Sequence, residues 1–275
     1  IDSYLDTLSN KEKREMTDEA IERIPATITS LSDNIFVAAK QIFEVYSPLF
    51  ISGIGSTLTL AFSGTILGLL IGLIIGAIRA IKVEERDSLI SKIVKRIVWF
   101  ITTVYIEIFR GTPMMVQGAF IYYGLKNIVH WSPFTAGVFV ITINTGAYMA
   151  EIIRSGIQAV DKGQSEAARS IGMNSVQTML YIVLPQAIKN SFPAIGNEFV
   201  INIKDSSVLN VIAVTELFYQ AKSVAGSLYA FVPTYFVVAL IYLCLTFPTT
   251  RILNYIEKRM NRKKAIVFDQ EGSVQ

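Results

Sequence analysis

The amino-acid sequence predicts an all-α integral membrane protein with five transmembrane helices. Of its 275 residues, 52% are hydrophobic and only 17% are charged, and the mean hydropathy is +0.46, which is more apolar than an ordinary soluble domain. Five segments have the length and composition of a bilayer helix. They cover roughly residues 57–78, 97–123, 134–153, 188–214 and 232–255. Five such segments leave too little polar surface to cover them in a soluble protein.

The distribution of basic residues predicts the orientation of these segments. Lys and Arg gather after the first, third and fifth segments, whereas the opposite connections hold only Lys126 and Lys222. Because cytoplasmic loops are enriched in Lys and Arg, we expect the N-terminus outside and the C-terminus inside. The formal net charge of +3 is then a sign of topology, and no nucleic-acid partner is predicted.

Three regions follow from this pattern. Residues 1–50 form a polar, helix-prone segment that we expect on the extracellular or periplasmic side, without the pattern of a cleavable signal peptide. Residues 51–255 form the transmembrane domain, and residues 256–275 a cytoplasmic tail. The chain does not begin with Met, and processing or a preceding extension both stay open.

The sequence offers little for catalysis or metal binding. Cys244 is the only cysteine and His130 the only histidine, so neither an intrachain disulfide nor a His/Cys metal site is predicted. The phosphate-binding pattern GxxxxGK[ST] is absent from the sequence. We therefore predict a chain that is not an enzyme and that binds no cofactor of its own.

Glycine recurs every four residues in the first apolar segment. Gly64, Gly68, Gly72 and Gly76 fall on one helical face, which allows a second helix to approach closely. This pattern predicts helix packing in a bundle or an oligomer rather than a lone anchor.

Charged residues interrupt the fourth segment. Glu198, Asn202 and Asp205 share one helical face, and Lys204 lies off it. A charge at mid-bilayer costs about 3 kcal/mol even on the mild insertion scale. Either these charges neutralise one another between helices or near the interface, or they line a cavity that binds a charged solute. We favour the cavity.

Polar residues beside these charges predict a broken helix. Asp205, Ser206 and Ser207 are cap-forming residues that could end one half-helix and begin another. Half-helix N-termini in transporters present backbone N–H groups to anionic substrate groups. A carboxylate near the serines and a cation near Glu198 and Asp205 would suit an amino acid.

The second segment contains another predicted break. Pro113 removes a helix hydrogen bond and disfavours helix at Thr112. Such a break requires protein or a wet cavity to satisfy the freed backbone groups. Gln117 follows one turn later, and Arg110 is a candidate counter-charge for Glu198 or Asp205, or a ligand for a substrate carboxylate.

Residues 161–175 form a polar segment between two apolar membrane segments. It reads as a short helix capped by Ser165 and ended by Gly172, with good helix formers between them. Such a segment suits a cytoplasmic docking surface.

The pattern EAAxxxG-x9-[IV]xLP from Glu166 to Pro185 resembles the signature loop of binding-protein-dependent ABC importer permeases. The matching residues are Glu166, Ala167, Ala168, Gly172, Ile182, Leu184 and Pro185. Two further motifs, Arg110-Gly111-Thr112-Pro113 with Gln117 and Lys204-Asp205-Ser206-Ser207, are similar to the polar amino acid subfamily.

This resemblance implies a type I ABC importer permease fold in the cell membrane of a prokaryote. The loop would form a coupling helix, with its contact to a separate ATPase subunit made by Gln164, Glu166, Ala167, Ala168, Arg169 and Gly172. Two ATPase copies would bind ATP and Mg²⁺, and a second permease and an extracellular solute-binding protein would complete the transporter.

The resemblance also implies a mid-membrane amino acid site. The predicted substrate-binding residues are Glu198, Asn202, Lys204, Asp205, Ser206, Ser207, Arg110, Thr112 and Gln117. A permease for another small solute, or a scaffold or sensor that docks an ATPase without transporting, are the alternatives.

Overall fold

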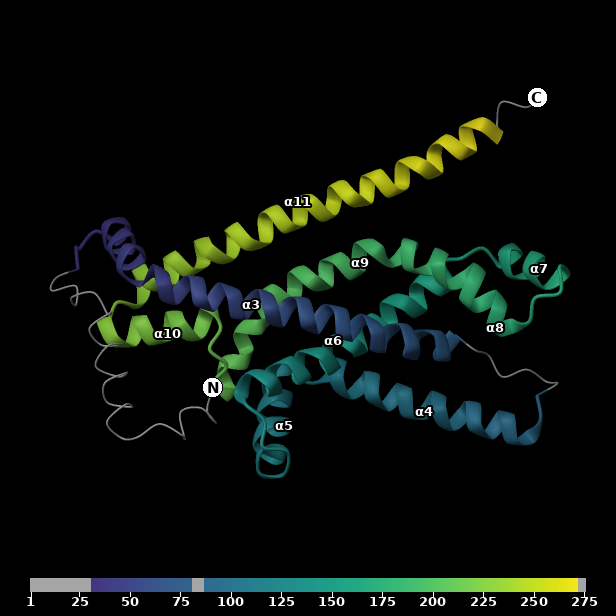
Figure 1. The fold of residues 1–275 in the computed structure, drawn as a ribbon, viewed down its shortest axis with the longest axis horizontal. Coiled ribbons are helices and arrows are strands. Elements are labelled where there is room, and N and C mark those ends of the chain that lie inside the picture. Colours follow the sequence, from purple (N-terminus) through teal and green to yellow (C-terminus); the bar gives the residue numbers. More distant parts are fainter. Residues whose placement is uncertain (1–30, 81–86, 272–275) are drawn as a thin grey trace, which may run out of the picture.

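A computed structural model describes residues 31–80 and 87–271, with side chains to Met260, and all regular secondary structure in this part of the chain is helical (Figure 1). The all-α prediction is confirmed. The elements are α3 (Ile35–Ala80), α4 (Leu89–Gly111), α5 (Met114–Val129), α6 (Pro133–Gln158), α7 (Lys162–Ser170), α8 (Ser175–Gln177), the π-helical η1 (Thr178–Val183), α9 (Leu184–Asp205), the 3-10 helix η2 (Ser206–Ile212), α10 (Leu217–Leu228) and α11 (Phe231–Glu271).

Three helices in the described part of the chain are long and apolar enough to cross a membrane. They are α3, α6 and α11 up to Met260. Charged and polar residues interrupt α4 and α9, which correspond to the second and fourth predicted segments.

The second predicted segment is two helices rather than one. Helix α4 ends at Gly111, and Thr112 is extended, with φ −125° and ψ 148°. This is the conformation that a following proline imposes. Pro113 then precedes α5, as the predicted break required.

Helix α3 begins upstream of the first predicted segment. It is continuous from Ile35, so the predicted boundary at residue 50 falls inside a helix. Ala39, Ile42 and Phe50 pack against Leu217 and Ala221 of α10, and this burial explains why the helix extends so far. Pro48 lies within it, and a proline inside a helix bends it. The rest of the predicted N-terminal segment, residues 1–30, lies outside the described residues.

The predicted C-terminal tail does not begin as a separate element. Helix α11 continues through residue 256 to Glu271.

The glycine face of α3 packs against α6, as the four-residue spacing predicts. Any Cβ at Gly64, Gly68, Gly72 or Gly76 would collide with Ile141, Thr145, Met149 or Ile153 respectively. These four α6 residues also recur every four positions. The two backbones therefore approach each other along four helical turns, and α6 lies at the centre of the bundle with one side against α3 and another against α9.

Large apolar side chains cover the outside of the bundle. Leu70, Ile74, Phe100, Phe120 and Leu243 are each more than half exposed. Exposed apolar area on this scale marks a surface that lipid or a partner covers.

A methyl group on the glycine face should destabilise the protein. Gly72→Ala places a Cβ 2.7 Å from the Met149 carbonyl carbon and 2.9 Å from the Ala150 amide nitrogen, so we expect a loss of about 1–3 kcal/mol. Gly55→Ala, also in α3, is the matched control because no atom lies within 4 Å of its Cβ. That change should be neutral or stabilise the helix. Thermal unfolding in detergent measures both, and equal stability of the two variants would contradict the packing.

Candidate functional site: a polar pathway and a docking helix

Helix α9 ends where the sequence predicts a break. Its last residue is Asp205, and the backbone tightens into the 3-10 helix η2 at Ser206. The expectation that Asp205, Ser206 or Ser207 caps a second half-helix is wrong. Asp205 makes no capping hydrogen bond, and the next α-helix, α10, is capped by Glu216, whose carboxylate accepts from the amides of Phe218 and Tyr219 at 2.8 and 2.7 Å.

The three charged residues of the predicted site on α9 differ in their exposure. Glu198 is buried, whereas Lys204 and Asp205 are exposed. No ion pair within 4.0 Å joins them to one another or to any other described residue. Helix α9 is regular through Asp205, so Lys204 stays off the face that carries Glu198. Opposite charges therefore lie side by side, unneutralised by direct contact, at the end of α9.

Arg110 does not act as the paired counter-charge that the sequence suggested. It is exposed, and its guanidinium lies 5.4 Å from the ring centroid of Tyr148. It forms no ion pair with Glu198 or with any other described residue.

Asn202 connects three helices. Its amide nitrogen donates to Thr65 of α3 at 2.9 Å, and its oxygen accepts from Thr145 of α6 at 3.0 Å. Asn202 is only 3% exposed, and both ends of its amide are occupied by neighbouring helices. Its geometry fits a structural link beside the site better than the predicted contact with substrate.

Gln117 closes the gap between α4 and α5. Its amide nitrogen donates to the carbonyl oxygens of Phe109 and Thr112 and to the Thr112 hydroxyl, at 2.8–3.0 Å. Asn144 of α6 donates to its amide oxygen at 2.9 Å. These bonds satisfy carbonyl groups that the helix break frees. Gln117 and Thr112, both predicted to bind substrate, thus serve the backbone of the break.

The two serines after the break also bond locally. Ser206 is fully buried and donates to the Ile203 carbonyl oxygen at 3.0 Å. The Ser207 carbonyl oxygen accepts from Asn210 at 2.6 Å.

Sequence reasoning missed Thr65, Thr145 and Asn144 as parts of these networks. Each is a hydrogen-bonding residue inside an otherwise apolar segment, and such residues join helices in a membrane. That signal was present, but the partners become visible only when the helices are assembled.

The short helix predicted within residues 161–175 is present as α7, with a different cap. The Asp161 carboxylate accepts from the Gly163 amide at 2.6 Å, so the prediction of Ser165 as the cap is wrong. Only residues 159–161 separate α6 from α7, so the helix begins before the predicted cap residue, and Asp161 is the residue at its N-terminus. Gly172 has φ +88° and terminates the helix region, as predicted. Ala168 is buried, and Gln164, Glu166, Ala167 and Arg169 are exposed.

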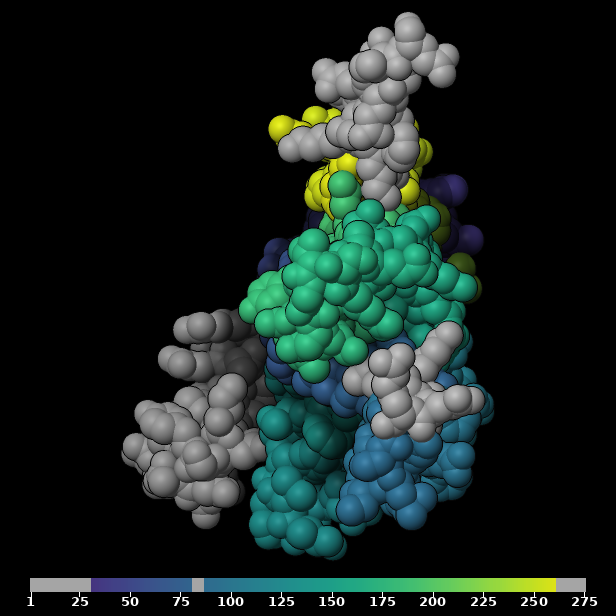
Figure 2. Space-filling view, turned by 90° about the vertical axis from the view of Figure 1, so that its right-hand side faces the viewer, coloured from purple at the N-terminus to yellow at the C-terminus, as the bar shows by residue number. Residues whose placement is uncertain are grey.

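Figure 2 shows this end of the molecule, with the teal and green residues of α7, α8 and the start of α9 in the middle of the face. Ile171, Val176 and Tyr181, in and beside this segment, are 65–79% exposed. The end therefore presents apolar side chains next to the exposed polar residues of α7.

One hydrogen bond joins α7 to α9, and a second set of contacts joins α9 to α6. The amide nitrogen of Gln186 in α9 donates to Gln164 in α7 at 3.3 Å. Gly156 of α6 lies directly against Ser191 of α9, whose hydroxyl donates to the Ile152 carbonyl oxygen at 3.1 Å. Helix α7 is therefore linked to α9 by this hydrogen bond and to α6 by the short connection at residues 159–161.

An ion cluster joins three helices at the same end. Glu151 of α6 bonds to Arg79 at the end of α3 and to Arg154, the latter at 2.7 Å. The Arg79 guanidinium lies 5.9 Å from the ring centroid of Trp99 in α4. This cluster holds α3, α4 and α6 together beside the docking helix.

Comparison with known proteins places these features in a family. Residues 88–262 match the family described as binding-protein-dependent transport system inner membrane component. The chain belongs to this family. The family prediction is confirmed: the chain is a permease, a transport subunit rather than an enzyme, and a multi-pass protein of the prokaryotic inner membrane.

Its relatives include named permeases. The probable glutamine ABC transporter permease GlnM of Bacillus subtilis (strain 168) is 45% identical over 161 residues, 58% of this chain and 74% of that protein. The glutamine transport system permease GlnP of Escherichia coli (strain K12) is 36% identical over 216 residues, 78% of this chain and 93% of that protein.

Solved structures show the same fold. The crystal structure of an amino acid ABC transporter with histidines matches with a TM-score of 0.70 and 39% identity, covering 83% of this chain and all of that one. An inward-facing MetNI methionine ABC transporter matches with a TM-score of 0.64 at 19% identity, covering 78% of this chain and 97% of that one, and shows similarity of fold alone.

Removing the Glu151 carboxylate should weaken the bundle at the docking end. Glu151→Gln leaves Arg79 and Arg154 without their shared anion, and we expect a loss of about 1–3 kcal/mol. Glu44→Gln is the matched control, because its pair with Lys40 is exposed and contributes less than about 1 kcal/mol. Thermal unfolding of the two purified variants tests this, and a Glu151 variant as stable as the Glu44 variant would contradict it.

Proposed function

We propose that this permease imports polar amino acids. We also propose that it crosses the membrane five times, with its N-terminus outside and its C-terminus inside. The observation that carries the substrate assignment is the end of α9, where exposed Lys204 and Asp205 lie side by side and the α-helix gives way to η2. Relatives named as glutamine permeases support the same substrate class.

The charges at this break match an amino acid zwitterion. Lys204 provides a cation for the substrate carboxylate, and Asp205 an anion for its ammonium group. Glu198 lies two turns earlier on the Asp205 face and adds negative charge to the site. This balance favours a zwitterionic or cationic substrate over an acidic one.

The topology follows from the side of the bundle that carries the basic residues. The start of α4, helix α7 and the far end of α11 lie toward the same end in Figure 1. Their basic residues include Lys92, Lys95, Arg96, Lys162, Arg169, Lys258 and Arg259. Basic ends face the cytoplasm, and α7 is then on the cytoplasmic side.

Transport is powered from outside this chain. A separate ATPase, in two copies, docks on α7 and supplies the energy of ATP hydrolysis. A second permease, identical or homologous, completes the pathway, and an extracellular binding protein delivers the solute. Because α7 is hydrogen-bonded to α9 and α9 to α6, its displacement by the ATPases moves α9 and exposes the site alternately to each side.

Charge reversal on α7 should weaken ATP-driven transport. Glu166→Lys changes an exposed residue of the docking helix, so we expect ATP-driven uptake of labelled glutamine to fall at least about tenfold, as for a lost contact of about 1.4 kcal/mol. Glu44→Lys, exposed on α3, is the matched charge reversal and should leave uptake unchanged. Vesicles containing the permease with its ATPase and binding protein provide the measurement, and full uptake by the Glu166 variant would refute the coupling role.

Loss of the buried carboxylate should affect cationic substrates most. Glu198→Gln keeps the shape of the side chain but removes its charge, so uptake of arginine should weaken more than uptake of glutamine. The KM for each amino acid in the same vesicles measures the difference, and size-exclusion chromatography checks that the complex assembles. Unchanged kinetics for both amino acids would argue against Glu198 in the pathway.

A further inference from the structure

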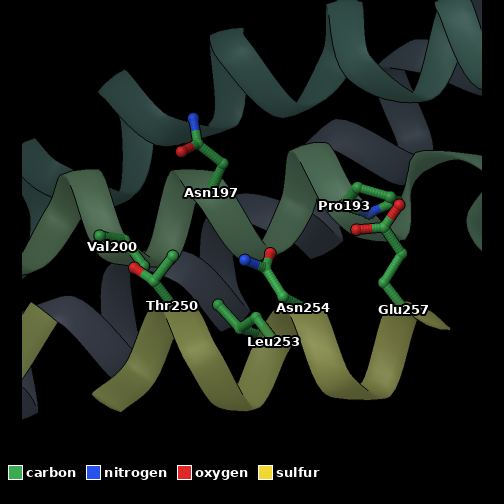
Figure 3. Close-up of a pocket in the computed structure, with 7 residues that line it drawn as sticks. All are labelled: Pro193, Asn197, Val200, Thr250, Leu253, Asn254 and Glu257. Carbon is green, nitrogen blue, oxygen red and sulfur yellow. The ribbon is translucent and has the colours of Figure 1, made fainter. Parts of the chain in front are cut away.

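A groove between α9 and α11 is lined by polar side chains that the proposed site does not use. Its lining residues are Pro193, Asn197, Val200, Thr250, Leu253, Asn254 and Glu257, and it encloses about 350 Å³ of space open to the surroundings. In Figure 3, Asn254 and Glu257 point from α11 toward α9, with Glu257 close to Pro193. Much of that space is open to solvent, and the part within the groove, about 80 Å³, has room for several waters or for part of a solute.

The polar groups of this groove are not used for packing. Asn197, Asn254 and Glu257 make no side-chain hydrogen bond or ion pair with any described residue, whereas Thr250 donates to the Thr246 carbonyl oxygen at 2.8 Å. Buried or membrane-facing polar groups normally find partners. The Asn254 amide and the Glu257 carboxylate therefore leave donors and acceptors available to water or a ligand, whereas the Asn197 side chain points away from α11 in Figure 3.

The placement of these groups on α11 is selective. Thr250, Asn254 and Glu257 recur at i, i+4 and i+7, so they form one stripe that faces α9. Ile252 and Tyr255, on other faces of the same helix, are 59% and 66% exposed and suit contact with lipid. Asn254 and Glu257 lie at the predicted cytoplasmic end of the last segment, where water reaches the groove, so the stripe is accessible to a solute from that side.

The groove lies along the route from the charged end of α9 to the cytoplasmic end. Pro193, Asn197, Val200 and Lys204 are spaced by four, three and four residues, which places them on one stripe of α9. Lys204 is therefore only about 10 Å along the helix axis from Asn197. A solute released at Lys204 and Asp205 meets this groove as it moves toward the docking end.

We propose that the α9–α11 groove is a second, exit-side binding subsite for the transported amino acid, in which Glu257 binds the ammonium group and Asn254 the carboxylate. The proposal rests on the function proposed above. The site is open, and a single carboxylate and amide hold the solute, so the subsite binds weakly and favours onward release.

Thiol labelling of the assembled transporter tests the subsite. The chain has one cysteine, Cys244, so Cys244→Ala provides the background. Thr250→Cys then reports on the groove without removing a proposed ligand group, and Ile252→Cys, two residues along α11 and on the opposite face, is the matched control. A charged, membrane-impermeant thiol reagent is applied to vesicles whose cytoplasmic face is outward, with and without millimolar glutamine.

We expect the Thr250→Cys variant to react at least about tenfold faster than the Ile252→Cys variant, because the reagent requires an accessible thiolate in water. Glutamine should slow that reaction at least about twofold once its concentration exceeds its dissociation constant. N-acetylglutamine, which lacks the ammonium group, should not protect. Adding Glu257→Gln should abolish the protection, and Glu257→Asp should retain part of it.

Two results would overturn the subsite: equal reactivity of the two cysteine variants, or no protection by glutamine. Uptake by the Cys244→Ala transporter, measured with glutamine, arginine and histidine, separates this inference from the proposed function. Uptake without protection refutes the subsite alone, whereas absence of uptake for every amino acid refutes the proposed function and the subsite with it.

Discussion

The close approach of α3 and α6 is the constraint on which the rest of the structure depends. Four glycines on α3 and four larger residues on α6 share a spacing of four, so the two backbones stay in contact for several turns. Only at that separation can the Thr65 and Thr145 hydroxyls both reach Asn202 of α9. Helix α9 is positioned by this pair, and with it the charged residues at its end.

The polar residues of the membrane domain divide into two groups. The first group bonds to other helices or to freed backbone carbonyls and consists of Asn202, Gln117 and Asn144. These bonds satisfy backbone and side-chain polar groups that would otherwise be unpaired in the bilayer. Lys204, Asp205, Asn254 and Glu257 have no such partners among the described side chains and stay available. Under the proposed function, the first group holds the helices of the pathway together and the second group binds the zwitterion.

The end of the bundle that carries α7 also combines residues used in helix packing with residues that stay exposed. Gly156 and Ser191 bring α6 and α9 together, and Glu151 with Arg79 adds α3, so this end is rigid where it meets the bundle. The outer residues of α7, including Glu166 and Arg169, are exposed. A rigid base and a free outer face are what a helix needs to transmit the motion of a partner subunit.

The sequence by itself determined the all-helical class, the glycine face, the breaks at Thr112-Pro113 and Asp205, the docking helix and the family. Each rests on local chemistry: a four-residue spacing, a proline without an N–H group, or a contiguous motif. The tertiary structure decided the rest. It assigned Asn202 and Gln117 to helix contacts, separated Arg110 from Glu198, replaced Ser165 by Asp161 as the cap, extended α3 to Ile35 and placed the Asn254–Glu257 stripe opposite α9. These outcomes depend on which helices become neighbours, and side chains far apart in the chain settle that only when they pack.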